Sequence, residues 1–261
     1  MSSFVLKIIA IITMFIDHIG YAIFREFSFF NYIGRIAFPI FAFQISEGYN
    51  HTKNLKKYFL RLFIFAIVSQ IPFMLFGKII SNDFTLNIFF TLLLGLISIY
   101  IYDKSKYKSL GIIISIIIGL LAEFAHCDYG FYGVAIIFLF YIFKNDIIKS
   151  SIAFMLATTI KYLIPMIKYG FYDVYLHLFI CTLLPIILIL LYNGQKGKDT
   201  KYLLYLFYPI HLLLIYGINL LLNSKIVLFS SVRQMHKIEG ILLPPILKLF
   251  IIDLLIYIFF C

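Results

Sequence analysis

Apolar runs long enough to cross a bilayer follow one another along almost the whole of this 261-residue chain, and they constrain its fold more than any other feature. A helix needs about 20 apolar residues to cross the hydrocarbon of a membrane. The segments that approach this length are 4–24, 29–48, 57–76, 84–102, 109–125, 129–143, 147–164, 171–192, 202–222 and 241–260. We therefore expect an all-α fold, a polytopic membrane bundle of about ten transmembrane helices.

Composition excludes the other broad classes. With 63% hydrophobic and 13% charged residues, the chain cannot cover a soluble domain with a polar shell. The net charge of +10 comes from short loops rather than one basic face, so we expect no nucleic-acid partner. Cys127, Cys181 and Cys261 lie far apart without the spacing of a zinc site, so neither a metal nor a disulfide is predicted. No repeat or long linker divides the chain, which predicts a single membrane domain over 1–261.

The first run, 4–24, has no small-residue cleavage site and is predicted to be a membrane helix, not a signal peptide. Loops after the second, fourth, sixth and eighth segments hold most of the Lys and Arg residues. Positive loops stay on the cytoplasmic side of a membrane, so both termini are predicted to be cytoplasmic.

Several polar residues share one predicted depth. Asp17 and His18 lie in the outer half, about 20 Å from the inner surface at 1.5 Å per residue. The residues predicted to lie toward the same outer face are Arg35, Gln70, Pro72, Asn87, Thr91, His126 and Asp128. An ionisable group in the apolar layer is costly unless it faces a partner or a wet cavity, so these positions predict a polar cavity.

Two interpretations of the first ionisable residues stay open. Asp17 and Arg35 suit a structural ion pair between the first two helices, whereas His18 has the chemistry of a general base. Successive helical residues point about 100° apart, so Asp17 does not orient His18 directly. Asp128 or another residue across the cavity is the expected partner.

Specific motifs then match a known family. The matching stretches are Asp17-His18-Ile19-Gly20, Gly34-Arg35-Ile36-Ala37-Phe38-Pro39, Ser46-Glu47-Gly48-Tyr49, Gln70-Ile71-Pro72, Asn87-Ile88-Phe89, Asp128-Tyr129-Gly130 and Tyr208-Pro209-Ile210-His211. In this order they resemble TraX-type proteins over about 1–220. The resemblance leaves 241–261 as an additional C-terminal membrane helix.

The resemblance implies a membrane-bound acyltransferase in the bacterial cytoplasmic membrane, because TraX proteins are similar to the acyltransferase 3 superfamily. Such enzymes move an acetyl or other acyl group from cytoplasmic coenzyme A to an acceptor. Acetyl-CoA is therefore the expected cosubstrate, with a pilin, peptide, glycan or lipid as acceptor and either an amine or a hydroxyl acylated. That wider group carries an arginine eleven positions before a first-helix histidine. Here Lys7 and His18 have this interval, which puts them on one helix face about 16 Å apart.

Roles follow from the same resemblance. His18 is expected to take the acceptor's proton, Arg35 or Asn87 to stabilise the oxyanion, and Asp17 or Asp128 to stabilise the imidazolium. The residues expected to bind the donor on the cytoplasmic side are Lys7, Glu47, His51, Lys53, Asn54, Tyr58 and Arg61. Basic residues there are also what orientation alone requires. The expected cavity lining is Gln70, Thr91, Tyr129 and His211, with simple packing an equal alternative for His211.

Two other function classes remain. Outer-half Asp, His and Arg residues also suit a small proton-coupled transporter, although the sequence gives no sign of repeated halves or paired broken helices. A non-enzymatic assembly factor for a pilus or conjugation system is the third.

Overall fold

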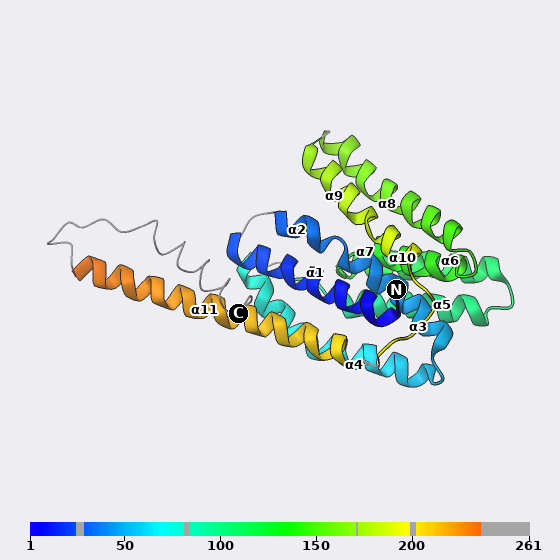
Figure 1. Ribbon diagram of the computed structural model, residues 1–261, viewed down its shortest axis with the longest axis horizontal. Helices are drawn as coiled ribbons and strands as arrows, with labels where there is room; N and C mark the ends of the chain where they lie inside the picture. Colours follow the sequence, from blue (N-terminus) through cyan, green and yellow to red (C-terminus); the bar gives the residue numbers. More distant parts are fainter. Residues whose placement is uncertain (25–28, 81–83, 171, 199–201, 236–261) are drawn as a thin grey trace. The chain divides into compact units, whose positions relative to one another are not determined.

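The computed structural model describes residues 1–24, 29–80, 84–170, 172–198 and 202–235, with side chains up to residue 222. Throughout these ranges the regular elements are helices, so the predicted all-α fold is confirmed (Figure 1). The helices are α1 (Ser3–Phe24), α2 (Phe29–Gly34), α3 (Ala37–His51), α4 (Leu55–Ile80), α5 (Ile88–Lys104), α6 (Lys108–Phe124), α7 (Gly130–Ile142), α8 (Ile147–Tyr169), α9 (Asp173–Leu183), α10 (Pro185–Leu190) and α11 (Leu203–Met235).

Each predicted segment up to 222 coincides with one helix or with a pair of consecutive helices, whereas 241–260 lies outside the described residues. Five helical stretches in the described part are long and apolar enough to cross a membrane: α1, α4, α8, Asp173–Leu190 and Leu203–Leu222. Helix α7 is apolar but has only 13 residues. The structure thus supports a multi-pass membrane protein with five candidate spans, and the count of about ten stays a prediction.

The second predicted segment is not one continuous helix. Arg35 and Ile36 separate α2 from α3, and their N–H groups donate to the carbonyls of Tyr32 and Ile33, each at 3.2 Å. Pro39 has no N–H to return to the Arg35 carbonyl, so the regular four-residue ladder cannot pass through this point. The charged side chain of Arg35 is therefore carried by irregular backbone inside an apolar segment.

The predicted segment 171–192 is also interrupted, where Leu184 joins α9 to α10 ahead of Pro185. The two interrupted segments are neighbours, because α2 packs on α9 and α3 packs on α10. Neither interruption is evident from the sequence, and Leu184 itself keeps helical backbone angles, φ −51° and ψ −36°. Irregular backbone at membrane depth is tolerated where it is buried in protein or lines a cavity.

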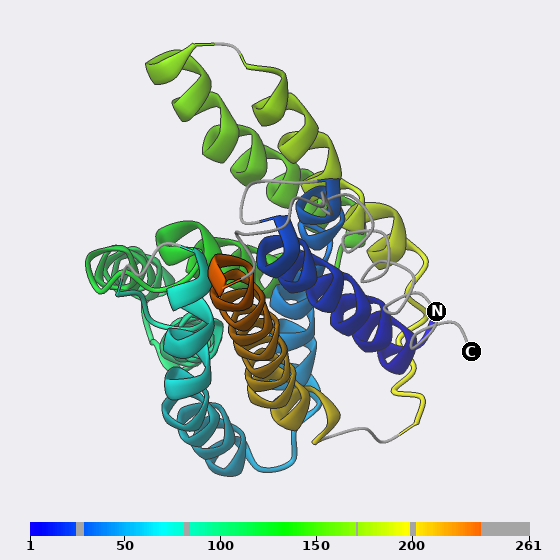
Figure 2. The same ribbon diagram turned by 90° about the vertical axis from the view of Figure 1, so that its left-hand side faces the viewer.

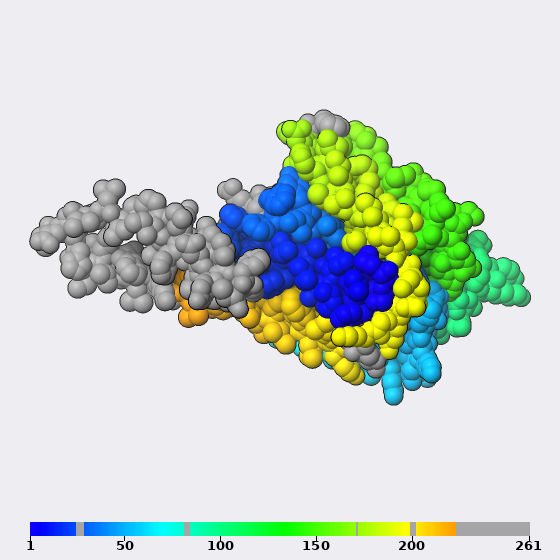
Figure 3. Space-filling model, in the orientation of Figure 1, coloured from blue at the N-terminus to red at the C-terminus, as the bar shows by residue number. Residues whose placement is uncertain are grey.

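Two compact units divide the chain, 1–219 and 220–261. Within the first unit, α3 is the central helix: all of its residues from Ala37 to Ser46 are buried, and it packs on α1, α5, α7 and α10. Figure 2 shows α3 (light blue) among these neighbours. The N-terminus of α1 is fixed by the loop after α10, because Ser3 and Phe4 donate to the carbonyls of Gln195 and Lys196. Figure 3 shows the start of the chain (dark blue) against this yellow part.

Large apolar side chains cover the outward faces of the long helices. On α4, Phe63, Ile67 and Ile71 are 48%, 53% and 69% exposed. On α6, Ile113 and Leu121 are similarly open. Soluble monomers rarely expose contiguous apolar surface of this extent, so these faces fit a lipid environment.

Candidate functional site

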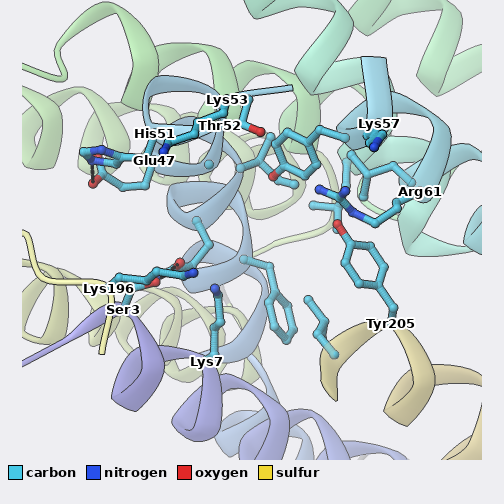
Figure 4. A pocket seen from close by; sticks show the side chains of 18 of the residues that line it. Ser3, Lys7, Glu47, His51, Thr52, Lys53, Lys57, Arg61, Lys196 and Tyr205 are labelled. Atoms are coloured by element: carbon cyan, nitrogen blue, oxygen red, sulfur yellow. Dashed lines mark hydrogen bonds and ion pairs between the residues drawn. The ribbon is translucent and has the colours of Figure 1, made fainter. Parts of the chain in front are cut away.

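A pocket of about 690 Å³ lies between α1, α3, α4, α11 and the loop that follows α10. Its lining includes every residue predicted to bind the acyl donor, namely Lys7, Glu47, His51, Lys53, Asn54, Tyr58 and Arg61 (Figure 4). Lys57 and Lys196 line it as well, and Glu47 is the only carboxylate among the lining residues. The pocket is therefore electropositive and suits an anionic ligand.

Helix α3 forms one wall of this pocket. Phe41, Gln44, Gly48 and His51 recur at helical spacing, so they face the same side. His51 is paired with Glu47 at 3.4 Å. A Cβ atom at Gly48 would lie 2.6 Å from the hydroxyl of Tyr58, so only glycine lets α4 pack this closely here.

Arg61 occupies the opposite wall. Its guanidinium carbon lies 5.6 Å from the centre of the Tyr58 ring, and Figure 4 shows the Tyr205 hydroxyl directed at it. Nε of Arg61 is buried and has no hydrogen-bond partner. A buried charged donor without a partner is costly, which is the condition expected of a residue that awaits an anion.

His18 on α1 and His211 on α11 are joined through their rings, although 193 positions separate them. Nδ1 of His18 lies 2.6 Å from Nε2 of His211, and Nδ1 of His211 lies 2.7 Å from the carbonyl oxygen of Phe207. A carbonyl can only accept, so His211 Nδ1 carries a hydrogen and His211 Nε2 accepts one from His18. The neutral His18 ring then has an unprotonated Nε2, which makes no hydrogen bond to any described residue.

The two imidazole rings meet edge to edge. Their planes are inclined by 13° and their centres are 4.9 Å apart. Stacked faces would hold the atoms about 3.5 Å apart, so the 2.6 Å between nitrogens requires an in-plane hydrogen bond. The ring of Phe207 stacks on that of His211 with 4.6 Å between their centres, and the ring centre of Phe76 lies 5.0 Å from that of His18. Both rings are therefore fixed in orientation.

Asp17 has different partners. Its Oδ1 accepts from Asn31 at 2.9 Å and from Arg35 at 3.5 Å, while Nε of Arg35 donates to the Asn31 carbonyl at 3.1 Å. A Cβ atom at Gly34 would collide with the Asp17 side chain. As helical geometry predicts, Asp17 faces α2 whereas His18 faces α11.

Asp128 lies in a strained loop between α6 and α7. Tyr129 has φ +64° and His126 has φ +51°, a left-handed conformation that bulky residues rarely adopt. Thr91 donates to the Asp128 carbonyl, and the loop pairs with Leu86, which fixes it to the start of α5. Strain of this kind persists where surrounding contacts enforce it, and it clusters at functional sites.

Burial raises the pKa of the Asp128 carboxyl to about 6, against the opposing effect of the positive charges on Arg35 and Lys161. Nζ of Lys161 lies 4.1 Å from the ring centre of Tyr132 and 4.6 Å from that of Tyr129. Two carboxylates and two cations thus lie within electrostatic range of one another. They are Asp17, Arg35, Asp128 and Lys161.

Gln70 and Asn87 form a closed network. Asn87 Nδ2 donates to the Ala66 carbonyl at 2.7 Å and to Gln70 Oε1 at 2.8 Å, and its Oδ1 accepts from Phe89 N at the start of α5. Gln70 Nε2 donates to the Thr85 carbonyl at 2.8 Å. The Oδ1 bond makes Asn87 the N-cap of α5, and both of its amide hydrogens are engaged as well.

Aromatic rings separate the pocket from the histidine pair. Tyr205 lines the pocket. The ring centre of Phe89 lies 5.8 Å from that of Tyr205 and 5.2 Å from that of Tyr208. The ring centre of Tyr208 is in turn 6.4 Å from that of His18. His18 itself does not line the pocket. Ring contacts through Tyr205, Phe89 and Tyr208 thus connect the pocket wall to the histidine pair.

Two residues have contacts that the sequence did not indicate. His211 was only one of several possible lining residues, because its contact with His18 depends on the packing of α11 against α1. Lys161 is not among the predicted site residues, although it falls inside the apolar segment 147–164. The rule that intramembrane ionisable residues indicate a site would have identified it.

The comparisons with known proteins agree with these motifs. The family described as TraX protein matches residues 2–219. The chain is 30% identical over 240 residues to the probable fimbrial assembly protein FimC, serogroup H1, of Dichelobacter nodosus, covering 85% of this chain and 97% of that protein. It is also 30% identical over 206 residues to the uncharacterized protein RP591 of Rickettsia prowazekii (strain Madrid E), covering 73% and 79%. No solved structure matches. The chain therefore belongs to the TraX family.

Proposed function

We propose that this protein is a membrane-bound acyltransferase that moves an acetyl group from acetyl-CoA to an amine or hydroxyl acceptor, with His18 as general base. The observation that carries the proposal is the relay from the Phe207 carbonyl through His211 to His18, which leaves Nε2 of His18 unprotonated. A general base needs that free nitrogen and a fixed ring. The proposal includes about ten spans, cytoplasmic termini and a location in the bacterial cytoplasmic membrane.

Acetyl-CoA is proposed to bind in the electropositive pocket. Lys53, Lys57 and Arg61 supply the charge for its phosphates, and the planar guanidinium suits two-pronged contact with a phosphate. Lys7 lies deeper on α1, on the face that leads to His18 about 16 Å away. The arm of the donor would then extend from the phosphates toward the base.

The chemistry requires no covalent enzyme intermediate. The acceptor nitrogen or oxygen attacks the thioester carbonyl carbon while Nε2 of His18 takes its proton. The carbon–sulfur bond then breaks, coenzyme A leaves as thiolate, and His18 returns the proton to that sulfur. The products are the acylated acceptor and free coenzyme A.

Charges near the base support this step. Arg35 has five N–H donors, more than its bonds to Asp17 and Asn31 use, so it is proposed to stabilise the oxyanion. The carboxylates of Asp17 and Asp128 would balance the imidazolium. Asn87 is given a capping role instead of a catalytic one, because both of its amide hydrogens are already engaged.

The thioester has to pass the aromatic series between the pocket and the base. Phe89 and Tyr208 are 1% and 2% exposed, so the route is closed in this conformation. We propose that donor binding moves these rings aside. Such closure would also keep water from the thioester in the absence of an acceptor.

The acceptor is proposed to be a component of a pilus or fimbria. This rests on the relative that is named as a probable fimbrial assembly protein. A pilin amine is the specific candidate, and another peptide, a glycan or a lipid remains an outcome of the test. A non-enzymatic assembly factor would share the partner but not the chemistry.

A second candidate, a proton-coupled transporter, is favoured by one observation. The interrupted segments α2–α3 and α9–α10 are neighbours, and Arg35 sits at one of the breaks. Interrupted helices form many transporter sites. Solute uptake driven by a proton gradient in proteoliposomes without coenzyme A would establish this function in place of acyl transfer.

The test of the enzyme is label transfer in membranes supplied with radiolabelled acetyl-CoA. Wild-type protein should label an acceptor, whereas His18→Ala, at equal protein level, should not. The control is His177→Ala. His177 is exposed, and its one described hydrogen bond is to the Asp173 carbonyl on its own helix. Equal labelling by wild type and His18→Ala would reject the proposal.

A further inference from the structure

Gln44 is a buried polar residue in the wall of the electropositive pocket. It is 8% exposed, and its Oε1 accepts a hydrogen bond from the hydroxyl of Ser3 at 2.7 Å. Its Nε2 is buried and has no hydrogen-bond partner. Both Gln44 and Ser3 line the pocket.

This arrangement is costly without a ligand. A buried amide donor with no acceptor loses about 1–3 kcal/mol relative to a satisfied one. The atom without a partner is Nε2, which can only donate, whereas Oε1 already accepts from Ser3. The missing partner is therefore a hydrogen-bond acceptor.

The position of Gln44 indicates which acceptor. His51 is the last residue of α3, and Gln44 lies about two helical turns before it. Gln44 is therefore nearer to the apolar lining residue Phe41. The lysines and Arg61 occupy other walls and suit phosphates, whereas a neutral amide donor suits a neutral carbonyl.

We propose that Gln44, oriented by Ser3, binds an amide carbonyl in the neutral arm of the acyl donor. This inference rests on the proposed function, because coenzyme A joins a phosphorylated nucleotide to an arm that contains amides. The phosphates bind at Lys53, Lys57 and Arg61, and Gln44 fixes the arm so that the thioester points toward His18. Ser3 is a positioning residue, since it acts through Gln44.

The experiment compares two probes on the full-length protein in nanodiscs. Acetyl-CoA carries the arm, and adenosine 3′,5′-bisphosphate carries only the nucleotide end. Gln44→Met keeps the length of the side chain and removes the donor. We expect it to weaken acetyl-CoA binding by about fivefold to tenfold and to leave binding of the bisphosphate unchanged. Ser3→Ala should produce a smaller loss of the same kind.

Ser69→Ala is the matched control, because Ser69 also has a buried hydroxyl without a partner but does not line the pocket. It should bind both probes as wild type does. Unchanged acetyl-CoA affinity in Gln44→Met would overturn the inference, and so would equal weakening of both probes. If wild-type protein bound neither probe, the proposed donor pocket itself would be rejected.

Discussion

Replacing His211 by phenylalanine should slow acyl transfer without weakening donor binding. Phenylalanine keeps a flat ring between Phe207 and Phe15, which contact His211 at 4.6 and 6.0 Å, but it removes the acceptor for Nδ1 of His18. His18 would then have a buried N–H without a partner, and its ring would be free to turn or to exchange tautomers.

The size of the effect follows from that lost hydrogen bond. An unsatisfied buried donor costs about 1–3 kcal/mol, and a loss of this size in the transition state corresponds to a fall in kcat of about fivefold to 150-fold. KM for acetyl-CoA should not change, because His211 does not line the electropositive pocket in which acetyl-CoA is proposed to bind. His211→Gln should recover part of the rate, since its side-chain oxygen can accept from Nδ1.

Initial rates in proteoliposomes over a range of acetyl-CoA concentrations give both constants. His177→Phe is the matched control, because that histidine is exposed on α9 and its substitution should leave both constants unchanged. The reasoning is refuted if His211→Phe, correctly folded, has the wild-type kcat, or if it alters KM alone.

Three further results are expected. Arg61→Gln should weaken acetyl-CoA binding by about tenfold to a hundredfold in calorimetry, because a hydrogen bond to a charged group contributes about 1.5–3 kcal/mol; unchanged affinity would exclude Arg61 from the donor site. The rate should fall as the pH drops through about 6, where the carboxyl of Asp128, its pKa raised by burial, gains a proton and loses its charge; Asp128→Asn should abolish this step, and an identical profile in both proteins would contradict the assignment. Gly34→Ala should lower the unfolding free energy by about 1–3 kcal/mol, because its Cβ meets the Asp17 side chain. Gly77→Ala, which meets nothing within 4 Å, should not lower it in thermal unfolding in detergent, and equal effects of the two glycine variants would count against the packing argument.

Much of the electropositive pocket was predictable from sequence because the residues predicted to bind the donor are mostly close together along the chain. Glu47, His51 and Lys53 end one predicted helix, and Tyr58 and Arg61 begin the next, so a short turn brings them together. Only Lys7 had to come from a distant segment, and the family resemblance supplied it.

The histidine pair depends on tertiary packing and was not predictable in the same way. No local pattern states which face of α11 lies against α1, and Asp128 was an equally reasonable partner for His18 until the 2.6 Å contact with His211 was known. The break at Arg35 was missed because apolar residues on both sides resemble one continuous span. Its cause, the missing N–H of Pro39, is local and can be recognised in the sequence.

The most direct test of the central claim is imidazole rescue of His18→Gly in a single-turnover transfer from radiolabelled acetyl-CoA. If His18 is the base, the variant should bind acetyl-CoA normally and transfer slowly, and added imidazole should restore the rate in proportion to its unprotonated form. A wild-type rate in His18→Gly without imidazole would contradict the account, because the reaction would then need no base at this position.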